Sequence, residues 1–153
     1  MQRLTHLDDQ GNATMVNITH KTNVHRTAIA EGYVYIRHET VLAIQQNTTP
    51  KGNVLSIAQL AGIMGSKHTS TIIPLCHPIP VDSVDVHIEL QDNRVYIQST
   101  VQNIWKTGVE MEALTAVMVS ALTIYDMLKA IDKSMIIDGI KLIEKTKIPL
   151  PIP

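Results

Sequence analysis

The chain has 153 residues, with 13 basic and 14 acidic side chains, 44% hydrophobic residues and only 3% aromatic residues. A chain of this length buries a core as one domain, without disulfides or a structural metal. Its single cysteine, Cys76, excludes an internal disulfide framework and a cysteine-rich zinc site. The balanced charge and the scarcity of aromatic side chains argue against a nucleic-acid partner. We expect one domain over residues 1–153.

Neither a membrane span nor a targeting segment is expected. The longest uncharged windows, residues 52–66 and 113–125, are shorter than the roughly 20 residues that cross a bilayer. The first nine residues lack the apolar run of a secretory signal. The sequence therefore predicts a cytoplasmic protein with no membrane partner.

The first half of the chain predicts an arm, a strand and two helices. Residues 1–25 are polar, with a turn signal at 9–12, and predict an extended N-terminal arm. Residues 26–37 are rich in β-forming side chains, and Gly32 among them indicates a bulge or bend. A short helix is expected over 38–46 and a loop over 47–50. After Lys51 and Gly52, apolar residues at helical spacing predict a second helix.

The second half predicts a stiff loop, a hairpin, a long helix and a last strand. Three prolines, Pro74, Pro78 and Pro80, enforce an irregular loop. Apolar and polar residues alternate over 84–90 and 95–101, which is typical of a hairpin of half-buried strands. Residues 110–131 form the longest helical pattern, residues 135–145 predict a closing strand, and 146–153 a short tail.

This order of elements predicts the fold class. Strand, helix, two strands, helix and strand form the split βαβ order of an α+β, ferredoxin-like sandwich. In that fold an antiparallel sheet carries its helices on one face. No repeat, linker or low-complexity segment divides the chain.

Lys51 and Gly52, at the start of the second predicted helix, are the first candidate for chemistry. Glycine allows a ligand to approach the backbone, and a helix N-terminus offers free N–H groups to an anion. Taken alone, a solvated lysine at a helix start is the favoured interpretation.

The second candidate group is Lys67 together with His77 on the proline-rich loop. A histidine between prolines is held rigidly, which suits a group that must be positioned. Cys76 is disfavoured as a nucleophile because adjacent side chains point apart and a buried free cysteine commonly acts as a small hydrophobe. The seven histidines show no metal-binding spacing, so no protein metal site is expected.

The third candidate group lies on the long predicted helix. Glu110 and Glu112 begin it, where carboxylates ordinarily complement the helix dipole. Asp126 and Lys129 lie three apart on one face, after a long uncharged run. The pattern fits two interpretations equally well: a partly buried pair with pKa values shifted toward acid–base work, or a structural ion pair at the solvent end of the helix.

The helix also separates two of these carboxylates. Glu112 and Asp126 are fourteen residues apart, about 21 Å along a helix. Both cannot touch one reacting atom. Either they hold opposite ends of a long substrate, or a neighbouring subunit completes the site around Glu112.

Four segments together resemble one known family. They are Lys51–Leu55 (KGNVL), Ile73–Pro78 (IPLCHP), Lys106–Ala116 (KTGVEMEALTA) and Ala121–Met127 (ALTIYDM). Their sequences and order are similar to those of cyclic pyranopterin monophosphate synthases, the molybdenum cofactor biosynthesis protein C family. The resemblance runs from about residue 15 to residue 145.

The resemblance implies a lyase that converts a cyclised dihydro-GTP to cyclic pyranopterin monophosphate and releases pyrophosphate. It implies a ferredoxin-like fold and a homohexamer, a trimer of dimers with active sites at the dimer interface. The resemblance implies no resident cofactor. Whether a divalent cation accompanies the pyrophosphate stays open.

The resemblance also implies a set of site residues, at the positions of this chain that match the family's motifs. Acid–base roles at the purine-derived ring fall to Asp126 and Lys129, with Lys51 assisting. The substrate-binding set comprises His77, Arg26 and Lys67 for the triphosphate, and Glu110 and Glu112 for the guanine-like edge.

Two positions depart from the family pattern. Asn17 stands where relatives often have an acidic residue, and the Gly-Gly-Lys-Ser-Gly tail is absent. Lys145 or Lys147 would then have to replace what that tail does.

Two other functions compete with this one. A ferredoxin-like domain can bind a small molecule without catalysis, although the Asp126–Lys129 pair argues for an enzyme. An RNA-binding module is disfavoured because the hairpin strands are expected to lack exposed aromatic side chains.

Overall fold

The computed structural model describes residues 7–8 and 10–151, and its elements are those of an α+β fold. In chain order they are β1 (Val24–Tyr35), α1 (His38–Gln45), α2 (Val54–Lys67), α3 (Thr69–Ile72), β2 (Ser83–Gln91), β3 (Arg94–Trp105), α4 (Glu110–Leu128) and β4 (Ile136–Pro149).

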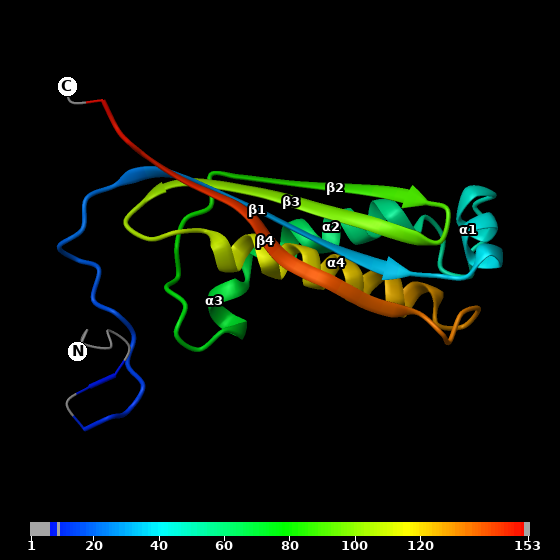
Figure 1. Ribbon diagram of the computed structural model, residues 1–153, viewed down its shortest axis with the longest axis horizontal. Helices are drawn as coiled ribbons and strands as arrows, with labels where there is room; N and C mark the ends of the chain where they lie inside the picture. The colour runs from blue at the N-terminus through cyan, green and yellow to red at the C-terminus, as the bar shows by residue number, and fades with distance from the viewer. Residues whose placement is uncertain (1–6, 9, 152–153) are drawn as a thin grey trace.

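The strands form one antiparallel sheet in the order β2-β3-β1-β4. Helices α2 and α4 lie side by side on one face of the sheet, and α1 lies at one end (Figure 1). The predicted α+β fold with helices on one face of an antiparallel sheet is therefore confirmed. Helix α3 is an additional short helix that the sequence pattern did not indicate.

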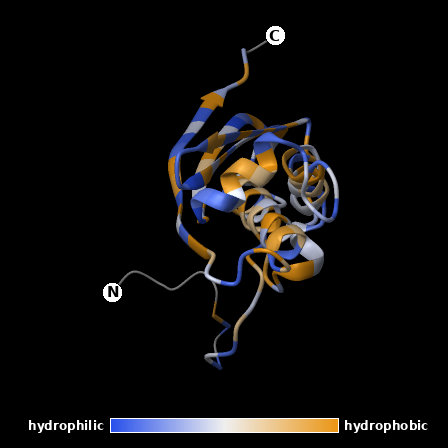
Figure 2. Ribbon diagram, turned by 90° about the vertical axis from the view of Figure 1, so that its right-hand side faces the viewer, coloured by the Kyte–Doolittle hydropathy of each residue, from blue (hydrophilic) through white to orange (hydrophobic). Residues whose placement is uncertain are grey.

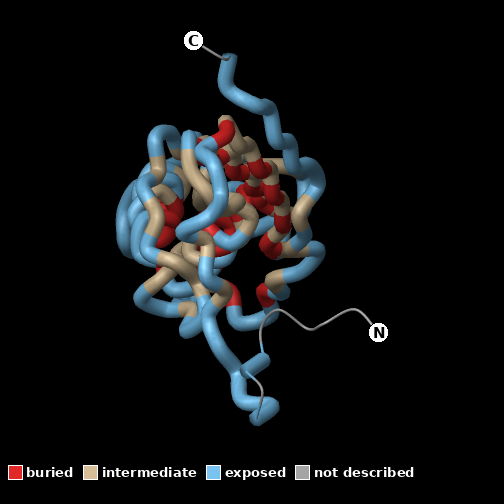
Figure 3. Tube along the Cα trace, turned by 90° about the vertical axis from the view of Figure 1, so that its left-hand side faces the viewer, coloured by how far each residue is buried: buried red, intermediate tan, exposed pale blue. Residues whose placement is uncertain are grey.

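The core lies between the sheet and the two long helices. Alternate residues of each central strand point toward the helices and are buried, as Val34 and Ile97 are. Figure 3 shows the buried residues gathered there, while the N-terminal arm and the C-terminal end of β4 are exposed. Gly62 allows α2 to approach α4 closely, because a Cβ at this position would collide with the Ser120 side chain.

Helix α4 ends three residues earlier than its apolar pattern predicts. The Leu128 carbonyl accepts hydrogen bonds from the amides of both Ile131 and Asp132, a shared bond that is common at helix ends. The fully buried Asp132 side chain then accepts bonds from the Arg37 amide and the Thr40 hydroxyl. These bonds join the segment after α4 to Arg37, which precedes α1, and to α1 itself.

Strand β4 is longer than predicted. Residues 146–149, expected in the tail, pair with β1, so that Lys147 lies opposite Arg26 and Pro149 opposite Val24. Backbone pairing with β1 therefore continues the strand beyond the apolar alternation on which the prediction rested. Both chain ends consequently emerge at the same end of the molecule (Figure 1).

Helix α4 is long and apolar enough to cross a bilayer by length and composition alone. The sequence-based prediction rested only on uncharged segments, and α4 was not among them because it includes Glu110, Glu112 and Asp126. In the fold 56% of that window is buried. The apolarity of α4 is accounted for by its place between the sheet and α2.

The opposite face of the sheet carries tyrosines. Tyr33, Tyr35 and Tyr96 lie together there, half-buried, with the Arg94 guanidinium 4.3 Å from the Tyr33 ring centre. The expectation that the hairpin strands lack accessible aromatic side chains is therefore wrong for Tyr96. Its hydroxyl donates to the Glu31 carboxylate, so a fixed polar network occupies this group.

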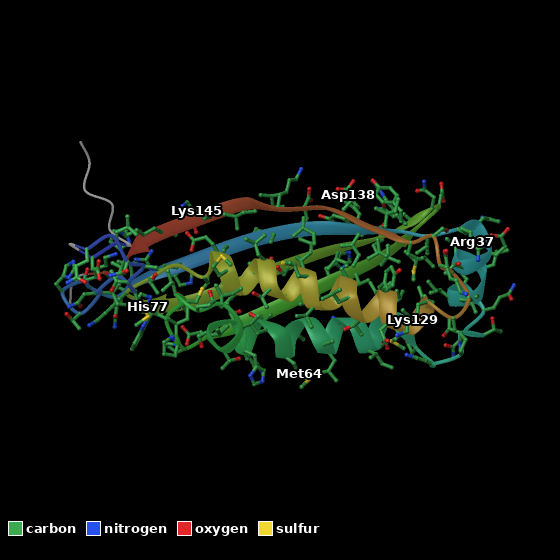
Figure 4. The ribbon with its side chains drawn as sticks, turned by 90° about the horizontal axis from the view of Figure 1, so that it is seen from below. Arg37, Met64, His77, Lys129, Asp138 and Lys145 are labelled. Atoms are coloured by element: carbon green, nitrogen blue, oxygen red, sulfur yellow. The ribbon has the colours of Figure 1, made fainter. Side chains whose placement is uncertain are left out.

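An apolar stripe runs along the outer side of α2 and α4. Helix ribbons in Figure 2 are largely hydrophobic, and the stripe comprises exposed side chains at helical spacing on both helices: Ile57, Leu60, Met64, Met118 and Leu122. Leu122 is 60% exposed and Leu60 59%. Figure 4 shows Met64 at the outer edge of this layer. Apolar surface of this kind typically marks an interaction site.

Candidate active site

Lys51, Asp126 and Lys129 meet at the C-terminal end of α4. The Asp126 carboxylate lies 2.6 Å from the Lys51 ammonium and 2.8 Å from the Lys129 ammonium. Lys51 also donates to the Asp126 backbone carbonyl at 3.1 Å. Lys51 reaches the group from the loop before α2, where Gly52 has a φ of 86° that favours glycine. The three residues predicted for acid–base steps are thus in direct contact.

This cluster is exposed, so the chain alone shows the exposed ion pair and not the partly buried pair. The side chains of Asp126 and Lys129 are 53% and 58% exposed. Hydrogen bonds from Lys129 and Lys51 lower the pKa of Asp126 to about 2, and Asp126 raises the pKa of Lys129. Within a single chain, both shifts stabilise the charged forms, and neither moves a pKa toward neutrality. The sequence could not decide between the two interpretations, because spacing shows an apolar helix but not where that helix ends relative to the surface.

A cavity of about 440 Å³ opens at the other end of α4. Its walls come from the proline-rich loop, the start of α4 and the N-terminal arm. Lining residues include Val16, Ile18, Cys76, His77, Glu110 and Glu112. His77 and Lys129 lie at opposite ends of the molecule in Figure 4. The helical separation predicted from the sequence is therefore present in the fold.

Glu112 is the buried acid of this cavity. Only 4% of the residue is exposed, and within the described residues no other side chain forms an ion pair or hydrogen bond with its carboxyl. Burial raises the pKa of the Glu112 carboxyl to about 7, and the neighbouring Glu110 charge adds to the rise. A buried carboxyl without an external partner suits a ligand that brings N–H donors.

His77 contacts the N-terminal arm. Its Nε2 lies 2.7 Å from the Val16 carbonyl oxygen, so Nε2 donates this bond. Lys106 donates to the Thr19 carbonyl at 3.0 Å and holds the same arm a little further along. The N-terminal arm, for which no helix or strand was predicted, thus forms one wall of the cavity.

Arg26 lies beside this cavity, at the start of β1. Its guanidinium donates to the carbonyls of Trp105 and Lys106, both at 3.1 Å, and so supports the loop that leads into α4. Arg26 lines a second, smaller hollow together with Glu110. Glu110 in turn lies 3.5 Å from the Lys145 ammonium.

Comparison with known proteins agrees with this arrangement of motifs. A family model described as MoaC family matches residues 15–147. The chain belongs to the MoaC family. The resemblance drawn from the four sequence segments is confirmed.

Relatives in this family are similar over nearly their whole length. A cyclic pyranopterin monophosphate synthase of Thermomicrobium roseum is 50% identical over 147 residues, covering 95% of this chain and 89% of the relative. The enzyme of that name from Heliobacterium modesticaldum is 49% identical, covering 95% and 93%. That of Corynebacterium glutamicum is 50% identical, covering 95% and 94%. The expected lyase activity in molybdenum cofactor biosynthesis is confirmed with the family.

The MoaC fold brings some predicted site residues together and keeps others apart. Lys51, Asp126 and Lys129 form one group, and His77, Glu110 and Glu112 share the cavity, with Arg26 adjacent. Lys67, the last residue of α2, is exposed and lines neither hollow. Within one chain, the Lys51–Asp126–Lys129 group and the His77–Glu112 cavity lie at opposite ends of α4.

Cys76 and several arm residues complete the cavity of this MoaC chain. Burial raises the pKa of the Cys76 thiol, and Glu112 adds to the rise, which keeps the thiol neutral. Val16, Ile18, His20 and Lys21 were missed because the arm has no periodic pattern. Within the described residues, no three His, Cys, Asp or Glu side chains converge to hold a metal ion.

Proposed function

We propose that this MoaC chain converts cyclised dihydro-GTP to cyclic pyranopterin monophosphate, with release of pyrophosphate, in a site that two copies of the chain build together. The activity rests on family membership over residues 15–147. One observation supports the shared site: the two groups of polar residues lie at opposite ends of α4.

The length of the helix carries this inference. Glu112 and Asp126 both belong to α4, with about 21 Å between them at the helical rise. A two-fold interface repeats the same patch on both subunits. An antiparallel pair of chains therefore brings the Lys51–Asp126–Lys129 group of one copy to the His77–Glu112 cavity of the other.

The exposed apolar stripe supports assembly beyond the monomer. Leu60, Met64 and Leu122 are each more than half exposed, which a soluble monomer rarely tolerates in one stripe. A homohexamer built as a trimer of dimers, as the resemblance implies, has room to bury both this stripe and the shared site. We infer a cytoplasmic location from the same biosynthetic role.

Asp126, Lys129 and Lys51 carry the acid–base steps. In one chain the Asp126 carboxylate is stabilised between two ammonium groups. Coverage by a second copy removes water from this cluster, and desolvation moves lysine and carboxylate pKa values toward neutrality. Asp126 then accepts a proton at the purine-derived ring while the lysines donate to the leaving nitrogen or oxygen atoms.

The opposite group binds the substrate. His77 and Arg26, with Lys67 if assembly brings it near, offer N–H donors to the triphosphate. Glu112 and Glu110 accept from the amino and ring N–H groups of the guanine-like edge. The buried Glu112 carboxyl favours this edge because that edge supplies the donors that the protein does not. A non-catalytic binding domain would need the cavity but not the Asp126 cluster.

Mixing two inactive variants tests the shared site. Asp126→Ala and His77→Ala should each abolish turnover while leaving the oligomer intact. After the subunits are mixed and exchanged, half of the dimers are mixed, and each mixed dimer holds one intact site. Activity should return to roughly a quarter of that of the wild type.

The control is a mixture of Asp126→Ala with Lys129→Ala, whose defects lie in the same group. That mixture should stay inactive, because no dimer would contain an intact site. Lack of recovery in the first mixture, with subunit exchange verified, would contradict the shared site. Near-normal pyrophosphate release by Asp126→Ala would contradict its catalytic role.

A further inference from the structure

Asp138 and Gly139 lie at an irregularity in the pairing of β4 with β1. Tyr33 pairs with Asp138 and Glu31 pairs with Lys141, so the β4 segment between these pairs is one residue longer than the β1 segment opposite it. An extra residue of this kind forms a β-bulge and leaves part of the strand outside the regular ladder. Asp138 and Gly139 are both exposed. In Figure 4, Asp138 lies on the side of the sheet away from α4, so solvent reaches this part of the backbone.

Position 139 requires glycine for two reasons. Its φ of 64° lies in the left-handed region that favours glycine. A Cβ at this position would also lie 2.8 Å from a ring carbon of Tyr33, closer than packed carbon atoms approach. The fold therefore keeps an Asp-Gly sequence on this exposed bulge. The chain contains no other Asp-Gly pair and no Asn-Gly pair.

The side chain of Asp138 is turned back onto the peptide group that follows it. The Gly139 amide donates to the Asp138 carboxylate at 2.7 Å, and within the described residues no other group forms an ion pair or hydrogen bond with this carboxylate. The amide nitrogen consequently lies next to the carboxyl carbon of Asp138. Two reacting groups held together in this way need no bimolecular encounter. Attack of the nitrogen on the carbon closes a five-membered ring, and glycine places no side chain in its way.

We propose that Asp138 is a site of spontaneous backbone isomerisation, through a succinimide formed with Gly139. The Gly139 nitrogen bonds to the carbon of the protonated carboxyl, whose hydroxyl leaves together with the amide proton as water. A water molecule then adds to the ring and breaks the bond between that nitrogen and the main-chain carbonyl carbon. The chain now runs through the former side-chain carbonyl as isoaspartate, and the former main-chain carbonyl becomes a free carboxylate. The water lost in the first step is regained in the second, so no oxidant, reductant or cofactor takes part.

Isomerisation lengthens the backbone of β4 by one carbon atom at the bulge. Pairing with β1 continues beyond the bulge as far as Pro149, and the Lys141–Glu31 ion pair, at 3.2 Å, belongs to the first cross-strand pair on that side. A longer backbone shifts this part of the strand against β1, and partners across the ladder lose their register. We therefore expect the isomerised protein to stay folded but to unfold at a lower urea concentration. This expectation is independent of the proposed function.

Ageing the full-length protein at neutral pH and mapping its peptides tests the proposal. Isoaspartyl and aspartyl peptides have the same mass but separate by chromatography, and a protein-isoaspartate methyltransferase with S-adenosylmethionine labels only the isoaspartyl form. Isoaspartate should accumulate severalfold faster at Asp138 than at Asp92, the matched internal control. Asp92 is an exposed aspartate in the turn between β2 and β3, and asparagine follows it instead of glycine.

Two substitutions should move the rate in opposite directions. Asp138→Glu should abolish the reaction, because a glutamate side chain closes a less favourable six-membered ring. Asp138→Asn should form isoaspartate faster than the wild type at neutral pH, because an amide releases ammonia more readily than an ionised carboxylate releases its oxygen. Neither substitution changes the backbone requirement at Gly139, so circular dichroism of the fresh proteins should be unchanged.

Urea unfolding of fresh and aged protein completes the test. The midpoint of the aged wild type should fall, whereas that of aged Asp138→Glu should stay where it was. Isoaspartate no more abundant at Asp138 than at Asp92 would overturn the proposal. So would equal isoaspartate at position 138 in Asp138→Asn and Asp138→Glu. Isomerised protein with an unchanged midpoint would overturn the expected effect on β4 pairing.

Discussion

Replacing Glu112 by glutamine tests the electrostatics of the cavity. Glu112 is 4% exposed, and the pKa of its carboxyl is raised from 4.5 to about 7. Glutamine has the size of a protonated glutamic acid but cannot ionise. The substitution therefore removes the free-energy cost of a buried charge without opening a cavity.

The sign follows from proton linkage. Between pH 4.5 and about 7 the unfolded chain has lost the Glu112 proton while the folded chain retains it. Wild-type stability therefore falls as pH rises through this range and levels off above it. A rise of about 2.5 pKa units corresponds to about 3 kcal/mol. Glu112→Gln should be more stable than the wild type by about that amount at pH 8, and by little at pH 4.5.

Urea denaturation at pH 4.5, 6 and 8 measures this difference, with protein concentration held constant because assembly contributes to stability. Glu144→Gln, an exposed position on β4, is the control and should change stability equally at every pH. A Glu112→Gln effect that does not vary with pH would refute the reasoning, because it would show that the folded and unfolded chains hold this proton equally well. The variant should also bind the substrate more weakly, because an amide donates where the ligand also donates.

Two further substitutions test the structural framework. Burial alone would raise the pKa of Asp132, but hydrogen bonds from Arg37, Ser134 and Thr40 lower it to about 2; this stabilisation is present above pH 3.8 and lost as pH falls through about 2. Asp132→Asn should therefore cost about 2 kcal/mol at pH 7 in urea denaturation and clearly less at pH 2, and a cost that is constant with pH would contradict this assignment. Leu122→Lys, on the exposed stripe, should leave secondary structure intact but shift the protein to smaller species in sedimentation velocity, and an unchanged distribution would argue that the stripe lies outside the interface.

Local patterns in the sequence predicted most of the fold. Alternation along Val84–Leu90 and 95–101 identified the hairpin, and helical spacing identified α4, because each element buries one face. The ends of α4 and β4 were less predictable. The side chain of Asp132 and the pairing of Lys147 with Arg26 decide where those elements end, and both depend on distant residues.

The sequence predicted which residues form the candidate site, but not how exposed or buried each of them is. The spacing of Asp126 and Lys129 correctly indicated an ion pair, yet its exposure came from the position of the helix end. Glu112 shows the reverse case. Its sequence position is that of an ordinary exposed first-turn carboxylate, but in the fold it is buried in the cavity. Glu112 is buried because the proline-rich loop and the N-terminal arm pack around the start of α4. These contacts are distant in the chain, so no local sequence pattern predicts them.

Turnover of the proposed substrate tests the central claim most directly. Purified protein is incubated with cyclised dihydro-GTP, and pyrophosphate and the pterin product are quantified over time. The account predicts that the two products appear in equal amounts and that Asp126→Ala forms neither. Well-folded, assembled wild-type protein that releases no pyrophosphate and forms no pterin would contradict it.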